Sequence, residues 1–177
     1  MTEPTKEKTV LIDRSLLEKI CSSQRWQTLL LKSFAAVSKP LSTETQITAS
    51  KAAIIEMADK AFCQLEEDDW LEAFAGHPMI GDISSLHKKY AQGKNLSENE
   101  QSQVSSAPEE VLQSLLELNH AYLDKFGFIF IICASDKSAQ EMLISLQGRI
   151  NNSRTDELLN ASVEQRKISH IRMEALL

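Results

Sequence analysis

Apolar side chains recur at intervals of three and four residues along most of the chain, a spacing that predicts helices rather than strands. Over 24–37 this spacing gives one buried stripe, formed by Trp26, Leu29, Leu30, Phe34 and Val37. Other helices are predicted from a cap at Asp13 to Ile20, over about 43–65 with Ile47, Ile54, Ala58 and Phe62 on one face, over 70–75 after a cap at Asp69, over 84–91, from Ser97, and over 108–126, 138–150 and 155–176. In the last helix Leu158, Ala161, Ile168, Ile171 and Ala175 are expected to share one side.

Two breaks in this pattern are informative. Gly76 is a residue that can end a helix in the left-handed conformation, and Pro78 prevents continuation, so His77 is expected in an extended conformation at the helix exit. The run 128–133 is rich in β-branched and aromatic residues, but no second run stands out to pair with it. We therefore expect extended or helical backbone there, within an α fold.

Few residues interrupt the helical pattern, because the 177 residues include only 5 Gly and 4 Pro and show no repeat or low-complexity tract. This length fits one domain with a sizeable core. The predicted fold is all-α, a single-domain bundle of about seven to nine helices over 10–177. Residues 1–9 are polar and lack periodicity, which predicts a flexible leader.

The net charge and the length of the apolar runs disfavour two classes of binding partner, nucleic acids and membranes. The formal net charge is −6 with both signs interspersed, so we expect neither nucleic acid nor an anionic membrane as partner. The longest apolar run, 128–134, is far shorter than the roughly 20 residues of a membrane span, and the N-terminus does not resemble a signal peptide. A cytoplasmic location is expected.

Three cysteines, Cys21, Cys63 and Cys133, lack metal-type spacing and are expected to be buried, reduced thiols.

Three polar clusters could carry chemistry: residues 77–82, residues 97–101 and Arg172. Taken singly, each has a structural explanation. A histidine at a helix end can be a capping residue, Ser97 with Glu100 matches a helix capping box, and Arg172 can form a surface ion pair. His77, Asp82 and His87 could be imagined around a metal, but their spacing matches no metal motif, so no metal is expected.

Taken together, the clusters and their order resemble one family, the 2-oxo-4-hydroxy-4-carboxy-5-ureidoimidazoline (OHCU) decarboxylases. The landmarks are His77-Pro78-x-Ile80-Gly81-Asp82, Ser97-x-x-Glu100-Gln101, Lys125-Phe126-Gly127-Phe128-x-Phe130, and Arg149-Ile150-x-Asn152 followed by Glu157, Ala161, Glu164, and Ile168 to Arg172. They span most of 13–177. Met79 departs from the pattern, because relatives commonly have a basic residue there.

The resemblance implies a set of site residues. The catalytic residues would be His77 and Glu100. The substrate-binding residues would be Pro78, Ser97, Gln101, Arg172 and the main-chain groups of Ile132, Cys133, Ala134, Ser135 and Asp136. The substrate would be the small molecule OHCU, the products (S)-allantoin and CO2 in purine degradation, with no cofactor, and the assembly a homodimer.

The residue types suit this chemistry. In OHCU a carbon–nitrogen double bond lies beside the carbon that loses CO2 and can receive the released electrons, so no pyridoxal or thiamine is needed. His77 can exchange a proton near neutral pH. Glu100 can accept a hydrogen bond from the substrate hydroxyl or fix the imidazole tautomer. Arg172 and Gln101 can orient the ureido and carbonyl groups. The amides of 134–136, expected at the start of the next helix, can hold carbonyl oxygens or an anion.

Two rival hypotheses belong to other classes. A non-catalytic helical interaction module would use the apolar stripes to bind partner helices, and it has no use for three separated polar clusters. A metal-dependent helical hydrolase would contain stoichiometric zinc or iron.

The closing Ala175-Leu176-Leu177 differs from the Ser-Lys-Leu peroxisomal signal, which again favours a cytoplasmic location.

Overall fold

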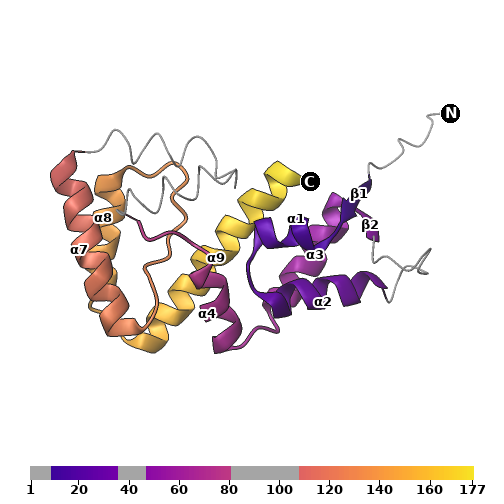
Figure 1. Ribbon diagram of the computed structural model, residues 1–177, viewed down its shortest axis with the longest axis horizontal. Coiled ribbons are helices and arrows are strands. Elements are labelled where there is room, and N and C mark those ends of the chain that lie inside the picture. The colour runs from indigo at the N-terminus through magenta and orange to yellow at the C-terminus, as the bar shows by residue number, and fades with distance from the viewer. Residues whose placement is uncertain (1–8, 36–46, 81–107) are drawn as a thin grey trace. The chain divides into compact units, whose positions relative to one another are not determined.

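The computed structural model describes residues 9–35, 47–80 and 108–177, and these form seven helices and one two-stranded sheet (Figure 1). The helices are α1 (Arg14–Ile20), α2 (Gln24–Ala35), α3 (Lys51–Phe62), α4 (Glu67–Ala75), α7 (Glu109–Phe126), α8 (Ala139–Arg149) and α9 (Arg154–Leu176), and the strands are β1 (Thr9–Ile12) and β2 (Ile47–Ser50). The predicted all-α class is confirmed. The helices expected over 84–91 and from Ser97 lie outside the described residues.

The chain forms two compact units. Unit 1 comprises 1–72 and 168–177, and unit 2 comprises 73–167. Helices α4 and α9 each contribute residues to both units.

In unit 1, an antiparallel sheet corrects two predictions. Strand β1 pairs with β2 so that Thr9 faces Ser50 and Ile12 faces Ile47. Thr9 therefore belongs to a strand and not to a leader, and the helix predicted from about 43 begins only at Lys51, after the side chain of Ser50 caps it. The error has a physical reason. Ile47 lies seven residues before Ile54, so it matched the helical spacing, and its true partner is distant in sequence.

The helices of unit 1 pack around aromatic side chains. Trp26 of α2 stacks on Phe62 of α3 with ring centroids 5.1 Å apart, and Phe62 stacks on Trp70 at 5.7 Å. The indole Nε1 of Trp26 donates to the carbonyl oxygen of Ala58 at 3.2 Å. Of the predicted stripe, Trp26, Leu30 and Phe34 are buried as expected, Leu29 is half-buried, and Val37 lies outside the described residues.

Helix boundaries agree well where a capping side chain marks them. Asp13 caps α1 by accepting from the Leu16 amide at 2.7 Å, as predicted. The cap predicted at Asp69 is wrong, because α4 begins at Glu67 and Asp69 instead accepts from the Glu66 amide inside the first turn. Cys63 is also a correction, since it is exposed, whereas Cys21 and Cys133 are buried as expected.

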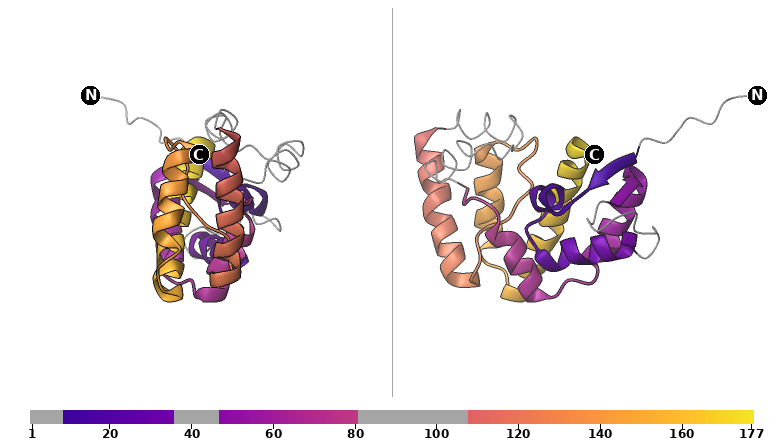
Figure 2. Two further views of the ribbon diagram at one scale, coloured as in Figure 1. Left: turned by 90° about the vertical axis from the view of Figure 1, so that its left-hand side faces the viewer. Right: turned by 45° about the vertical axis from the view of Figure 1, so that its right-hand side comes forward.

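In unit 2, α7 and α8 lie side by side, as both ribbon views show (Figure 2). Helix α7 ends at Gly127, which adopts φ +81° and donates its amide to Leu123, so the predicted end is confirmed. Ser138 and Glu141 form a reciprocal capping box at the start of α8. Between α7 and α8, residues 128–133 belong to no helix and to no strand, so the expectation that this run finds no partner strand is confirmed.

The buried face of α9 corrects another prediction. Ala161 and Ile168 are buried as expected and Leu158 is half-buried, but Ala175 is exposed and Ile171 is 40% exposed. Polar residues complete the buried face instead, because Glu157, Gln165 and Ser169 are fully inaccessible. Such residues are assigned to the surface by any hydrophobic pattern, so this face could not be found from periodicity.

None of the described helices combines the length and the apolar character that crossing a bilayer requires.

Candidate functional site

His77 lies where α4 ends, in unit 2. The amides of Gly76 and His77 donate to the carbonyls of Ala73 and Phe74 at 3.2 and 3.0 Å, which closes the helix with a tight turn. Pro78 follows and has no amide hydrogen to continue it. Phe74 is fully buried and packs against Phe128 with ring centroids 5.3 Å apart. The predicted helix exit at His77 is confirmed, but Gly76 does not end the helix in the left-handed conformation, because among the described glycines a positive φ is found at Gly127.

The imidazole of His77 contacts a buried amide. Its Nε2 lies 2.7 Å from Oε1 of Gln165 in α9. Gln165 has no exposed surface, whereas His77 is partly exposed. This arrangement holds one ring nitrogen inside unit 2 while part of the residue remains accessible.

Asn119 joins the segment after His77 to the irregular segment 128–133. Its side chain is fully buried in α7, and its Oδ1 accepts from the Phe130 amide at 3.0 Å. Its Nδ2 donates to the carbonyl of Ile80 at 3.4 Å. One amide side chain therefore satisfies backbone groups of two segments that contain predicted site residues.

Glu164 contacts the predicted main-chain part of the site. One oxygen accepts from the Cys133 amide at 2.7 Å, and the other pairs with Nζ of Lys167 at 2.5 Å. Burial by itself raises the pKa of Glu164, but the hydrogen bonds from Lys167 and Cys133 outweigh it and lower the pKa below its ordinary value. Glu164 is therefore an anion that holds Cys133.

The residues after Cys133 form a turn. The amide of Lys137 donates to the carbonyl of Ala134 at 3.1 Å, and Asp136 adopts φ +62°, which is uncommon for a residue other than glycine. Helix α8 begins at Ala139. The amides of 134–136 thus belong to a turn before the helix, which corrects their predicted place at its start.

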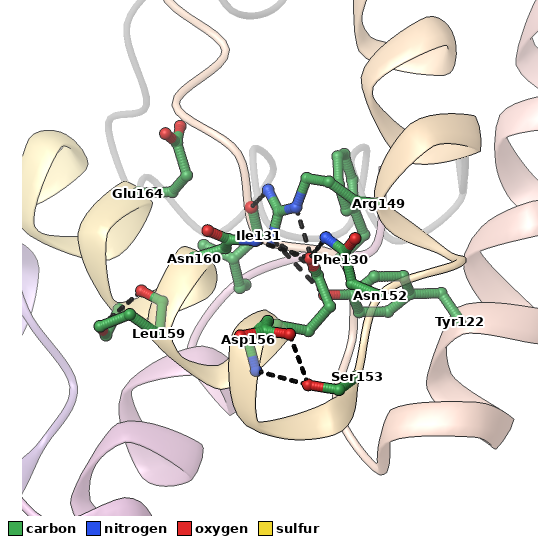
Figure 3. A network of polar contacts seen from close by, with 12 residues as sticks. Tyr122, Phe130, Ile131, Arg149, Asn152, Ser153, Asp156, Leu159, Asn160 and Glu164 are labelled. Carbon is green, nitrogen blue, oxygen red and sulfur yellow. Dashed lines mark hydrogen bonds and ion pairs between the residues drawn. The ribbon is translucent and has the colours of Figure 1, made fainter.

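A buried polar network lies beside the segment 128–133 in unit 2 (Figure 3). At its centre is the carboxylate of Glu157, which is fully buried. Arg149 donates to it from Nε at 2.9 Å and pairs with it through Nη2 at 2.8 Å, and Asn152 and Asn160 donate at 2.7 and 2.8 Å. The hydroxyl of Tyr122 also donates to it. The carboxylate is surrounded by donors.

This network also holds the segment 128–133. Arg149 Nη1 donates to the Ile131 carbonyl at 2.9 Å, and its guanidinium lies 4.6 Å from the centroid of the Phe130 ring. Lys125 Nζ donates to the carbonyls of Ile150 and Asn152 at 2.6 and 3.2 Å. Several landmarks of the family pattern therefore position the backbone of the site.

Arg172 belongs to unit 1. Its Nη1 donates to the carbonyl oxygens of Lys19 and Ile20 at 3.4 and 3.3 Å, at the end of α1. Ser97, Glu100 and Gln101 lie outside the described residues. Of the predicted site residues, the structure brings His77 and Cys133 into contact with consecutive residues of one helix, Gln165 and Glu164.

Within the described ranges, no group of three or more histidine, cysteine, aspartate or glutamate side chains could hold a metal ion.

Two residues at this site were missed by the sequence reasoning, Asn119 and Gln165. Neither has a local signal, because each polar side chain sits in an ordinary helical sequence and its partner is far away in the chain. Glu164 was quoted only as a landmark, without a role.

Comparison with known proteins gives a consistent result. A family model described as OHCU decarboxylase matches residues 13–174. A uric acid degradation bifunctional protein from Arabidopsis thaliana is 41% identical over 140 residues, which are 78% of this chain and 42% of that protein. A 2-oxo-4-hydroxy-4-carboxy-5-ureidoimidazoline decarboxylase from Halalkalicoccus jeotgali is 29% identical over 110 residues, 60% of this chain and 57% of that protein. The chain thus matches less than two thirds of the length of either relative.

Solved structures agree. A crystal structure of an OHCU decarboxylase in the presence of (S)-allantoin is similar with a TM-score of 0.69 and 33% sequence identity, covering 93% of this chain and 98% of that one. A crystal structure of an (S)-allantoin synthase is similar with a TM-score of 0.62, covering 92% of this chain and 49% of that one. Its 18% identity makes it evidence for the fold alone.

Proposed function

Because the chain belongs to the OHCU decarboxylase family, we propose that it is a carboxy-lyase that converts OHCU to (S)-allantoin and CO2 in urate degradation. The reaction breaks the bond between a ring carbon and its carboxylate, and the neighbouring carbon–nitrogen double bond receives the electron pair. One proton is taken up overall for each CO2 released. The protein has to place that proton on one face of the ring and to stabilise the developing charge.

In the proposed mechanism His77 and Glu100 handle protons. Arg172, Gln101 and Ser97 orient the substrate, and Pro78 with the backbone of 132–136 completes the pocket. No cofactor takes part, because the substrate supplies its own electron sink.

One observation carries the proposal: His77 and Cys133, which come from separate parts of the chain, contact adjacent residues of α9 in unit 2. The His77 ring meets Gln165 at 2.7 Å, and the Cys133 amide meets Glu164 at 2.7 Å. One turn of α9 therefore holds both the imidazole that would carry the proton and the beginning of the backbone segment 132–136 that would bind the substrate.

Circular dichroism with freshly generated substrate tests the activity. Uricase and hydroxyisourate hydrolase supply OHCU from urate, and the enantiomeric excess of allantoin is recorded, because OHCU also decays spontaneously to racemic product. The wild-type protein is expected to give excess (S)-allantoin, and His77→Ala and Glu100→Ala are expected to lose about 100-fold or more in rate.

Matched variants separate these roles from general damage. His120→Ala and Glu117→Ala replace the same residue types at exposed positions of α7 and are expected to retain wild-type rates. If His77→Ala and Glu100→Ala also retain them, the proposed roles are wrong. If the wild-type protein gives racemic allantoin at the spontaneous rate, the proposed activity is wrong.

The proposed assembly is a homodimer in the cytoplasm. The family resemblance supports the homodimer. Sedimentation equilibrium of the purified chain measures its mass in solution, and a mass of one 19.9 kDa chain across the working concentration range would contradict the dimer.

A further inference from the structure

The contact between His77 and Gln165 constrains the chemistry of the imidazole. A neutral imidazole carries its hydrogen on either Nδ1 or Nε2, and the two forms differ in which nitrogen can accept a proton. The atom that faces Nε2 of His77 is Oε1 of Gln165, at 2.7 Å. An amide oxygen only accepts hydrogen bonds. The contact is therefore favourable only when Nε2 carries the hydrogen.

We propose that Gln165 is a positioning residue that fixes the tautomer and the orientation of the His77 imidazole. This inference rests on the proposed function, because it specifies how the proposed proton carrier is held. Gln165 acts through His77, in the way that a hydrogen-bonded neighbour orients the histidine of other catalytic sites.

The surroundings of Gln165 explain why it can serve this purpose. Its side chain is fully buried, so it is not free to exchange its partner for bulk water. The preceding residue, Glu164, accepts a hydrogen bond from the Cys133 amide, which anchors this turn of α9 to the segment 128–133. One turn earlier, Ala161 is also fully buried. The amide oxygen is thus presented from a well-anchored helical turn.

The fixed tautomer has a consequence for the reaction. With the hydrogen on Nε2, Nδ1 retains the lone pair and is the nitrogen that can accept a proton. A neutral ring in this form has no Nδ1 hydrogen to donate to a carboxylate. Of the two roles considered for Glu100, fixing the tautomer is therefore already performed by Gln165, which leaves Glu100 to accept the hydrogen bond of the substrate hydroxyl.

Nitrogen NMR of the histidine rings tests the inference without any need for activity. The protein labelled with nitrogen-15 contains 4 histidines, and the signals of His77 are identified by their loss in His77→Gln. At a pH where the ring is neutral, wild-type Nε2 is expected to show the shift of a protonated nitrogen and Nδ1 that of an unprotonated one. Gln165→Met, which has a similar volume but no amide oxygen, is expected to show averaged shifts from both tautomers.

Two further variants complete the design. Gln165→Glu keeps an accepting oxygen, so Nε2 is expected to keep its hydrogen. Gln147→Met makes the same replacement at an exposed position of α8 and is expected to leave the ring shifts unchanged. In the coupled assay, Gln165→Met is expected to lower kcat about tenfold with little change in KM.

The outcomes separate the inference from the proposed function. Wild-type protein with the hydrogen on Nδ1, or unchanged shifts in Gln165→Met, would overturn the inference even in an active decarboxylase. The expected shifts in a chain that produces no excess of (S)-allantoin would support the role of Gln165 in holding His77 and overturn the decarboxylase.

Discussion

Glu157 is a buried carboxylate that remains charged because its neighbours donate to it. Burial by itself raises its pKa, but the hydrogen bonds from Arg149, Tyr122, Asn152 and Asn160 outweigh that effect and lower the pKa. The same contacts act on Tyr122, whose pKa is raised by burial and then by its hydrogen bond to Glu157. An ionised Glu157 and a neutral Tyr122 are thus mutually consistent.

Replacing Glu157 tests the importance of this charge. Glu157→Gln keeps the shape but leaves the largely buried guanidinium of Arg149 without its counter-charge. We expect the free energy of unfolding to fall by about 3 kcal/mol, measured by urea denaturation. Glu56→Gln is the control, because its ion pair with Lys60 is exposed on both sides and should contribute no more than about 0.5 kcal/mol. Equal effects from the two variants would contradict a special role for the buried pair.

At the residue scale, the sequence shows which residues belong to the family pattern better than it shows which side chains they contact. The family pattern singles out Arg149, Asn152 and Glu157, but it does not say that they meet in one network. Gln165 was not identified at all. A polar residue on the buried face of a helix looks like a surface residue until the distant partner that satisfies it is known, and here that partner is His77, 88 positions away.

At the scale of elements, local chemistry determines helix ends. Glycine at the end of α7 is required because Gly127 has φ +81°, where a side chain is strained. Gly148, by contrast, lies within α8, where glycine is not required. A Cβ added there would meet nothing within 4 Å.

This contrast gives a paired prediction. Gly127→Ala is expected to lower the free energy of unfolding by about 1 kcal/mol, because alanine has to adopt the left-handed conformation. Gly148→Ala is expected to raise it by about 0.5 kcal/mol, because alanine loses less backbone entropy on entering a helix. Thermal unfolding followed by far-ultraviolet circular dichroism measures both changes in stability. A gain of stability in Gly127→Ala would refute the argument.

The elements that the sequence predicts well are those whose signals are local. Ser138, Pro108 and Gly127 mark ends that the structure places within one residue of the prediction. The sheet was missed because its pairing joins Ile12 to Ile47, and neither strand alternates over enough residues to reveal itself.

At the scale of the whole molecule, two buried or half-buried carboxylates couple stability to pH. The pKa values of Glu157 and Glu164 are lowered in the folded chain, so the unfolded chain binds protons more readily than the folded chain. Their contribution is therefore complete above their ordinary value of 4.5 and is lost as the pH falls through the lower folded values.

The expected result is a free energy of unfolding that decreases steadily below the ordinary glutamate value of 4.5. Urea denaturation at a series of pH values measures it. In Glu157→Gln the slope of this decrease should be smaller, because one of the two groups no longer titrates. An identical slope in wild type and variant would show that Glu157 contributes nothing to acid sensitivity.

The distribution of aromatic residues has a practical outcome for such experiments. Both tryptophans, Trp26 and Trp70, lie in unit 1, where each stacks on the ring of Phe62. Indole emission is consequently an optical reporter of the packing around Phe62. A change in that emission during urea denaturation would follow the loss of this aromatic stack.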